Sequence, residues 1–180
     1  MAAATEDRTV SRRAAICSAT LSAATLMMAA TIERPAVRAI WNVSASVPIG
    51  LYRLRPIDGP VQGELVAVQP PEPLASFLAD RGYLPRGVPM LKHVMALPGQ
   101  TVCRIGPTLS IDNVEVGHAR ERDSQGRPLP VWQGCHVIVD GETFLMNARS
   151  AVSLDGRYFG GLPVTTIIGR TEPLWVSGED

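Results

Sequence analysis

Two serines in a turn-forming stretch are the first residues whose types and spacing could perform chemistry. Residues 42–52 read N-V-S-A-S-V-P-I-G-L-Y, so Ser44 and Ser46 are two positions apart and Pro48 follows closely. A residue before proline is pushed toward extended geometry, which predicts a bend at Ser46 with backbone N–H groups free beside its hydroxyl. A serine nucleophile needs such preorganised donors for its oxyanion. The alternative is an ordinary Ser/Pro/Gly turn at a strand end, and this stretch taken alone favours that alternative.

A lysine inside an apolar segment is the second candidate. Lys92 lies in M-L-K-H-V-M-A-L-P-G-Q, and strand alternation places it on one face with Val94 and Ala96. Burial disfavours the charged form of a lysine, so its pKa falls and the neutral amine can serve as a base. The alternative is a lysine on an edge strand that protects the sheet against aggregation, and this segment alone favours the edge strand.

The third candidate lies near the C-terminus, in residues 153–160, S-L-D-G-R-Y-F-G. Asp155 and Arg157 are two positions apart and could form a local ion pair, while Ser153 offers a free hydroxyl. The alternative is a polar turn that leads into a strand.

The composition predicts a β-dominated body that must position these groups. Fifteen prolines and sixteen glycines, with few aromatic residues, indicate many short strands and turns. One short helix is expected at 74–81, with Pro73 near its start and Gly82 at its end. Residues 35–41 read as a linker and 120–130 as an exposed loop. Strands are expected at 64–69, 91–97 and 101–105, in a hairpin over 109–116, in a hairpin of 136–140 with 143–146, and at 157–159 and 165–169.

Charge and cysteine content exclude several classes of function. Acidic and basic residues balance at 17 each, which gives no electrostatic case for binding nucleic acid. The three cysteines lack C-x-x-C spacing and the three histidines are not grouped, so neither a zinc site nor any other cofactor is expected. Cys103 and Cys135 could form a disulfide if the body lies in an oxidising compartment.

The N-terminal region predicts membrane attachment. Residues 14–32 are uncharged and follow Arg12 and Arg13. In a helix this stretch would be roughly 28 Å long, which just spans a bilayer core. The arginines before it place residues 1–13 in the cytoplasm and a domain of residues 33–180 in the periplasm, behind an anchor or uncleaved signal at 14–32. A cleavable signal peptide is the rival interpretation.

The three motifs together resemble the membrane-anchored serine–lysine peptidases of the signal peptidase I superfamily, and most closely its TraF-type conjugal-transfer branch. They are S-A-S-V-P-I-G-L-Y, L-K-H-V-M-A-L-P-G-Q and S-L-D-G-R-Y-F-G, in the family's order behind an N-terminal anchor. The resemblance covers residues 14–169. It implies a mainly β fold, with a signal-peptidase-like antiparallel β-barrel or sheet as the catalytic domain, one transmembrane helix and one short helix.

The resemblance also implies a role for each motif. Ser46 is matched to the nucleophile and Lys92 to the general base. Ser44 is matched to a side-chain donor to the oxyanion, beside the Ser46 N–H. Ser153 is implied to orient the lysine amine, while Asp155 and Arg157 brace the site. Of these matches, that of Ser153 is the weakest, because the family's acidic-asparagine box is reduced here to N-A-R-S at 147–150.

The implied activity is acyl transfer at a peptide bond of an exported precursor, with conjugative pilin as the expected substrate and head-to-tail cyclisation as a possible second outcome. The expected partners are that precursor and membrane lipid, without nucleic acid. The expected location is the bacterial inner membrane, with the catalytic domain in the periplasm. The alternatives are a general type I signal peptidase and a catalytically silent periplasmic module of a conjugation apparatus. Ser46-Val47-Pro48 is the shorter TraF-type form of the serine motif, which argues against the first alternative.

Overall fold

The computed structural model describes residues 15–25, 27 and 39–177. The chain divides into two units, Met1–Val37 and Arg38–Asp180, which are treated separately. In the first unit, residues 15–25 and 27 are helical and exposed. Among the described residues, no helix is long and apolar enough to cross a membrane. Residues 14, 26 and 28–32 of the predicted anchor lie outside the described part.

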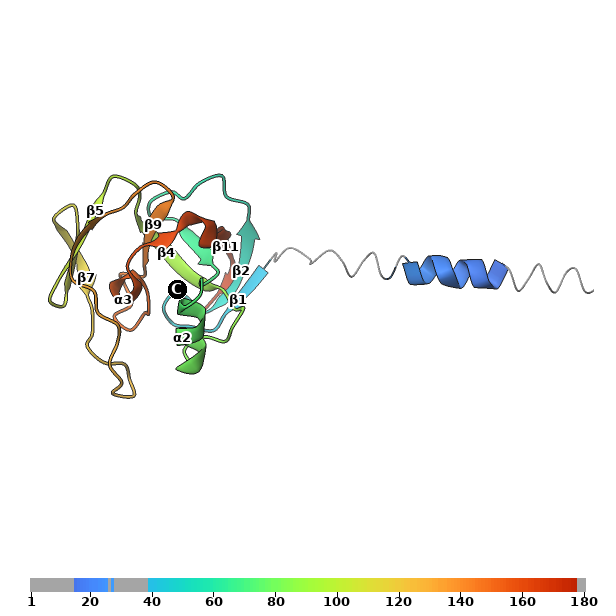
Figure 1. The fold of residues 1–180 in the computed structure, drawn as a ribbon, viewed down its shortest axis with the longest axis horizontal. Coiled ribbons are helices and arrows are strands. Elements are labelled where there is room, and N and C mark those ends of the chain that lie inside the picture. The colour runs from blue at the N-terminus through green and yellow to red at the C-terminus, as the bar shows by residue number, and fades with distance from the viewer. Residues whose placement is uncertain (1–14, 26, 28–38, 178–180) are drawn as a thin grey trace, which may run out of the picture. The chain divides into compact units, whose positions relative to one another are not determined.

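The second unit is built around a sheet of seven strands in which every pairing is antiparallel (Figure 1). The long β11, whose register shifts between Pro173 and Trp175, pairs with both β2 and β3. In spatial order the strands are β1 (Ala39–Asn42), β2 (Gly50–Arg55), β11 (Ile167–Val176), β3 (Leu65–Val68), β4 (Met90–Ala96), β9 (Glu142–Met146) and β10 (Leu162–Pro163).

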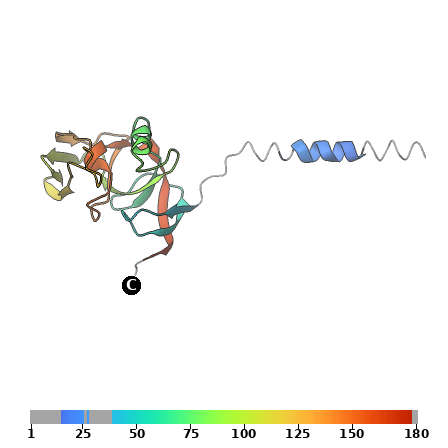
Figure 2. The same ribbon diagram turned by 90° about the horizontal axis from the view of Figure 1, so that it is seen from below.

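A second, four-stranded antiparallel sheet follows the order β7 (Val114–His118), β6 (Thr108–Ile111), β5 (Thr101–Ile105) and β8 (Gly134–Val137). Figures 1 and 2 show it beside the larger sheet. Asp112 and Asn113 both have positive φ, 49° and 68°, at the predicted β6–β7 hairpin turn. Cys103 faces Cys135 across β5 and β8, and the two form a disulfide, which confirms the predicted bridge.

The helices of the second unit are short. The predicted helix is confirmed as α2 (Leu74–Asp80), after Pro73 and before Gly82, whose φ is 70°. A second helix, α3 (Gly156–Phe159), is capped by the Asp155 side chain, and a 3₁₀ turn covers Val164–Thr166.

Three apolar clusters hold the domain together. The first joins both sheets to α3, with Val102 from the small sheet, Phe144 from the large sheet and Tyr158 from α3. The second packs Leu78 of α2 against the large sheet. The third lies beneath the turn at residues 43–49 that carries Ser44 and Ser46, here named the serine turn. Its buried members are Ile40, Val47, Tyr52, Ala67 and Leu91. Burial of these side chains provides the main stabilising free energy of the fold.

Four sequence-based predictions of local structure are wrong at least in part. The strand expected at 165–169 begins only at Ile167, because residues 164–166 form the 3₁₀ turn. Residues 39–41, read as a linker, belong to β1, which pairs with β2. The expected hairpin of 136–140 with 143–146 does not form, because β8 pairs with β5 in the small sheet whereas β9 pairs with β4 in the large sheet. Residues 157–159, read as a strand, are helical because the Asp155 carboxylate accepts a hydrogen bond from Arg157 N and caps the turn.

Candidate active site

The serine turn is the loop of a wide hairpin between β1 and β2. Asn42 faces Gly50 across the two strands, so residues 43–49 form the connection. Glycine is needed at position 50 because a Cβ there would lie 2.1 Å from the carbonyl oxygen of Trp175 on β11. Val47 is 5% exposed in the apolar cluster beneath the turn, which fixes the loop to the sheet. Ser46 is therefore held at a bend, as predicted.

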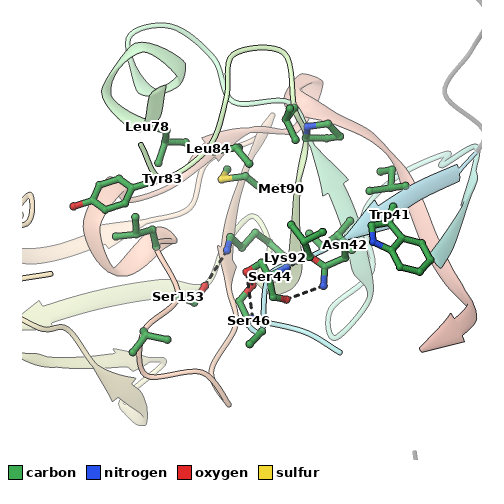
Figure 3. Close-up of a pocket in the computed structure, with 18 residues that line it drawn as sticks. Trp41, Asn42, Ser44, Ser46, Leu78, Tyr83, Leu84, Met90, Lys92 and Ser153 are labelled. Carbon is green, nitrogen blue, oxygen red and sulfur yellow. Dashed lines mark hydrogen bonds between the residues drawn. The ribbon is translucent and has the colours of Figure 1, made fainter. Parts of the chain in front are cut away.

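Ser44 and Ser46 contact each other directly. The Ser44 hydroxyl donates to Ser46 Oγ at 3.1 Å, and the Ser46 N–H donates to Ser44 Oγ at 3.3 Å (Figure 3). The two groups expected to stabilise an oxyanion are thus adjacent but paired with each other. These two hydrogen bonds would have to break before a substrate carbonyl oxygen could accept hydrogen bonds from both the Ser44 hydroxyl and the Ser46 N–H.

Asn42 fixes the shape of this turn, and sequence reasoning gave it no role. Its side-chain amide donates to the carbonyl oxygens of Ser44, Val47 and Pro48, at 2.8, 3.2 and 3.0 Å. Its Oδ1 accepts from Ser44 N at 3.1 Å, which is the hydrogen bond of an Asx turn. The signal in the sequence was an asparagine two positions before a serine in a Pro/Gly-rich stretch.

Lys92 is buried in the middle of β4, opposite Val66 of β3, and only 5% of it is exposed. Burial lowers the pKa of the Lys92 amine to about 8; the charge of Asp155 opposes this shift and that of Arg157 adds to it. Lys92 is therefore buried, as a lysine that acts as a neutral base must be. The alternative of a lysine on an edge strand is wrong, because β4 pairs with β3 on one side and β9 on the other. With this pKa about one tenth of the amine is neutral at pH 7, far more than for an ordinary lysine.

The lysine amine is oriented by Ser153. Nζ donates to Ser153 Oγ at 2.9 Å, which is the contact that the resemblance implied (Figure 3). No hydrogen bond joins Lys92 to Ser46 in the described part of the chain, although a general base must come within hydrogen-bond reach of the nucleophile to take its proton. Catalytic hydrogen bonds are often long in unliganded structures and tighten when substrate binds.

A buried ion pair supports the loop that carries Ser153. Arg157 Nη2 and Asp155 Oδ2 are 2.9 Å apart, and both side chains are almost fully buried, as the predicted local pair required. The same Nη2 also donates to the carbonyl oxygens of Ser150 and Ser153, at 2.6 and 3.3 Å. Arg157 therefore shapes the turn that presents Ser153 to Lys92.

Asn147 connects this turn to the lysine strand, and it too was given no role by sequence reasoning. Its Nδ2 donates to Leu91 O at 3.0 Å and its Oδ1 accepts from His93 N at 3.2 Å, so it grips β4 on both sides of Lys92. Its own N–H donates to Asp155 Oδ2 at 3.1 Å. Its sequence signals were its place directly after the predicted strand 143–146 and its membership of the N-A-R-S segment that stands for the family's acidic-asparagine box.

Ser46, Lys92 and Ser153 line one cavity of about 320 Å³. Its other walls are mostly apolar and come from β1, the segment after α2, the start of β4 and the loop before α3 (Figure 3). Among the described residues, no group of three or more His, Cys, Asp or Glu side chains is arranged to hold a metal ion. The cavity offers a hydroxyl, a lysine amine and backbone donors, which is the chemistry of acyl transfer through a serine ester.

A serine turn and a buried lysine on an antiparallel β scaffold define a candidate serine–lysine acyl-transfer site. The sequence matches the family described as signal peptidase, peptidase S26, over residues 11–176. The chain belongs to this family, in its TraF-type branch.

Three relatives and one solved structure show what the chain is similar to. The conjugal transfer protein TraF of Agrobacterium fabrum is 37% identical over 74% of this chain and 80% of its own length. The probable conjugal transfer protein TraF of Sinorhizobium fredii is 34% identical over 86% and 87% of the two chains. A plasmid transfer protein TraF of Escherichia coli is 31% identical over 74% and 80%. A crystal structure of signal peptidase I from Enterococcus faecalis, 20% identical, covers 63% of this chain and 97% of its own, with a TM-score of 0.38.

Proposed function

We propose that this protein is a serine endopeptidase that cleaves an exported precursor protein, with Ser46 as nucleophile and Lys92 as general base. The observation that carries the proposal is the cavity shared by Ser46 and Lys92, in which the lysine is buried and its pKa is lowered to about 8. A histidine is not needed, because a neutral lysine amine performs the same proton transfers.

In the proposed reaction, neutral Lys92 Nζ takes the proton of the Ser46 hydroxyl while Oγ attacks the scissile carbonyl carbon. The negative oxygen that forms is stabilised by the Ser46 N–H and the Ser44 hydroxyl. Protonated Lys92 then donates its proton to the leaving amine, and the C–N bond breaks to leave an ester on Ser46. Water attacks this ester with Lys92 again as base, which releases the acid and restores the serine. Ser153 keeps the amine aimed throughout.

The acyl half of the substrate would occupy the cavity of Lys92. The apolar walls suit small apolar side chains, and the resemblance implies alanine-like residues at the first and third positions before the cut. One wall is β1, which is the terminal strand of its sheet. Among the described residues no strand pairs with its outer edge, which could therefore pair with an extended peptide.

The precursor we favour is a conjugative pilin. The relatives are named as conjugal or plasmid transfer proteins, which supports a role in conjugation. We further propose that residues 14–32 attach the domain to the inner membrane, with the catalytic domain in the periplasm beside a membrane-embedded substrate. A pilin N-terminus held close to the ester could replace water as the attacking group, because a neighbouring amine acts at high effective molarity. Cyclisation would then compete with hydrolysis.

Two alternatives are kept. A general type I signal peptidase would process many exported precursors, and a silent module would process none. The buried amine with a lowered pKa favours a working enzyme over a silent module, since an unused buried lysine only costs stability.

A donor strain that carries Ser46→Ala tests the proposal. We expect unprocessed pilin precursor to accumulate while other exported proteins mature normally. Intact mass of the pilin from the parent strain then separates the two products, because a cyclic chain is lighter than the linear one by one water. Normal pilin maturation in the Ser46→Ala strain would refute the peptidase role.

A further inference from the structure

A second cavity also reaches Ser46. It has a volume of about 820 Å³, and Lys92 is not among the residues that line it. Its walls are the serine turn at 45–49, two side chains of β4, the loop at 147–150 after β9, and Gly63 and Ser177. Ser46 therefore stands where the two cavities meet.

A peptide cleaved at Ser46 must extend in both directions from the scissile bond. If the acyl half lies in the apolar cavity of Lys92, the second cavity is the space that remains for the leaving half. The walls differ in character: besides Ser46, the second cavity is lined by Arg149, His93 and two further serines.

The second cavity is lined by a positively charged side chain, that of Arg149, and by no negatively charged one. Arg149 is exposed, and within the described part of the chain its guanidinium forms no ion pair or hydrogen bond. No aspartate or glutamate lines the cavity. An arginine fork binds a carboxylate through two parallel hydrogen bonds, so an acidic side chain is the group that complements this wall.

The imidazole of His93 is held in a defined orientation. Asn147 Nδ2 donates to Leu91 O, so the amide oxygen faces His93, where it accepts from the backbone N–H at 3.2 Å. The same oxygen lies 3.0 Å from Nδ1, and an amide oxygen can only accept, so Nδ1 carries a proton. In the described residues Nε2 has no hydrogen-bond partner, which leaves it for a polar group of a bound peptide.

We propose that this second cavity binds the substrate segment on the leaving side of the cut, and that Arg149 selects an acidic side chain within the first three residues of that segment. The inference rests on the proposed function and names the substrate class more closely. Arg149 is a specificity determinant and takes no part in the proton transfers.

The test uses the full-length protein in detergent and a set of quenched fluorescent peptides. All carry alanine at the first and third positions before the cut, and each carries glutamate, glutamine or lysine at one of the three positions after it. At one of these positions we expect kcat/KM for glutamate to exceed that for glutamine by about two- to five-fold, in the upper part of the range for accessible ion pairs. Arg149→Gln removes this preference and Arg149→Glu shifts it to lysine. Arg53→Gln, the same change at an exposed arginine that lines neither cavity, leaves the preference intact.

Equal rates for the three peptides, or a glutamate preference that survives in Arg149→Gln, would overturn the inference and leave the peptidase role standing. If the wild-type protein cuts no peptide, the proposed function fails. The role of Arg149 is then tested by measuring how tightly the peptides bind. A glutamate-containing leaving-segment peptide should then bind Ser46→Ala protein more tightly than its glutamine counterpart, and Arg149→Gln should abolish the difference. Equal binding of both peptides would contradict it.

Discussion

In the proposed mechanism the buried Lys92 is the general base, so its protonation state would set the activity. The wild-type protein should therefore gain activity with rising pH. Burial lowers the pKa of Lys92 to about 8, and only the neutral amine can accept the serine proton. We expect kcat/KM to rise by about tenfold per pH unit below pH 8 and to level off above it. A profile of peptide cleavage between pH 6 and 10 measures this. A profile that falls with pH in this range would exclude Lys92 as the base.

The same burial costs stability, which Lys92→Met should recover. The charged amine is disfavoured in the folded state, since the folded pKa of about 8 lies below the ordinary value of 10.5. Below pH 8 the wild type carries this full penalty. Between pH 8 and 10.5 the folded chain has released the proton that the unfolded chain still binds, so rising pH favours the folded state and the penalty shrinks until it vanishes above 10.5. Lys92→Met should raise the free energy of unfolding by about 1–3 kcal/mol at pH 7 and by less at pH 10.

Urea unfolding of the full-length protein at the two pH values measures the difference. Ser153→Ala is the matched control, because it removes the partner of the amine without removing the charge. A Lys92→Met protein that is less stable at pH 7, or a gain that grows with pH, would contradict the assigned cost of burial.

At the scale of elements, the site depends on the turn between β9 and α3. Arg157 neutralises Asp155 and satisfies three carbonyl oxygens there, those of Asn147, Ser150 and Ser153. Arg157→Met should lower the free energy of unfolding by about 3–5 kcal/mol, because it leaves a buried carboxylate unpaired. Thermal unfolding measures the loss, with Arg53→Met as the exposed control. A change no larger than that of the control would mean that the pair does not support the site.

Some elements of the fold could be predicted from the sequence and others could not. The strands near Lys92 and the hairpin at Asp112 follow from alternation and turn residues, and the structure confirms them. Periodicity in the sequence predicts that a segment is a strand but not which other strand it pairs with. The predicted pairing of β8 with β9 is therefore wrong, since the two strands belong to different sheets. Asn42 and Asn147 were missed for a related reason, since their roles consist of hydrogen bonds to backbone groups that only the folded chain brings near.

On the scale of the whole molecule, the small sheet is linked to the support of the site. Arg104 of β5 donates to Arg157 O at 2.6 Å, and Trp132, just before β8, donates to Gly156 O at 3.0 Å. The disulfide between Cys103 and Cys135 joins these two strands across a separation of 32 residues. The small sheet thus helps to hold α3 in place.

Loss of this disulfide should destabilise the domain. The double variant Cys103→Ser and Cys135→Ser should lose about 3–4 kcal/mol in the free energy of unfolding, as the chain-entropy relation gives for a loop of this length. Chemical unfolding of the oxidised wild type and of the variant measures it. Cys17→Ser is the control, because Cys17 is a free cysteine. Equal stability of the double variant and the wild type would show that the bridge does not stabilise the fold.

The most direct test of the proposed Ser46–Lys92 dyad is cleavage of a purified pilin precursor by the full-length protein in lipid vesicles. The wild type and the exposed-site variant Arg53→Gln should release the mature pilin. Ser46→Ala and Lys92→Ala should each lower the rate by at least about a thousandfold, since each removes a group that acts in every step of the reaction. Circular dichroism of each variant verifies that it is folded. Substantial cleavage by either folded variant would contradict the account.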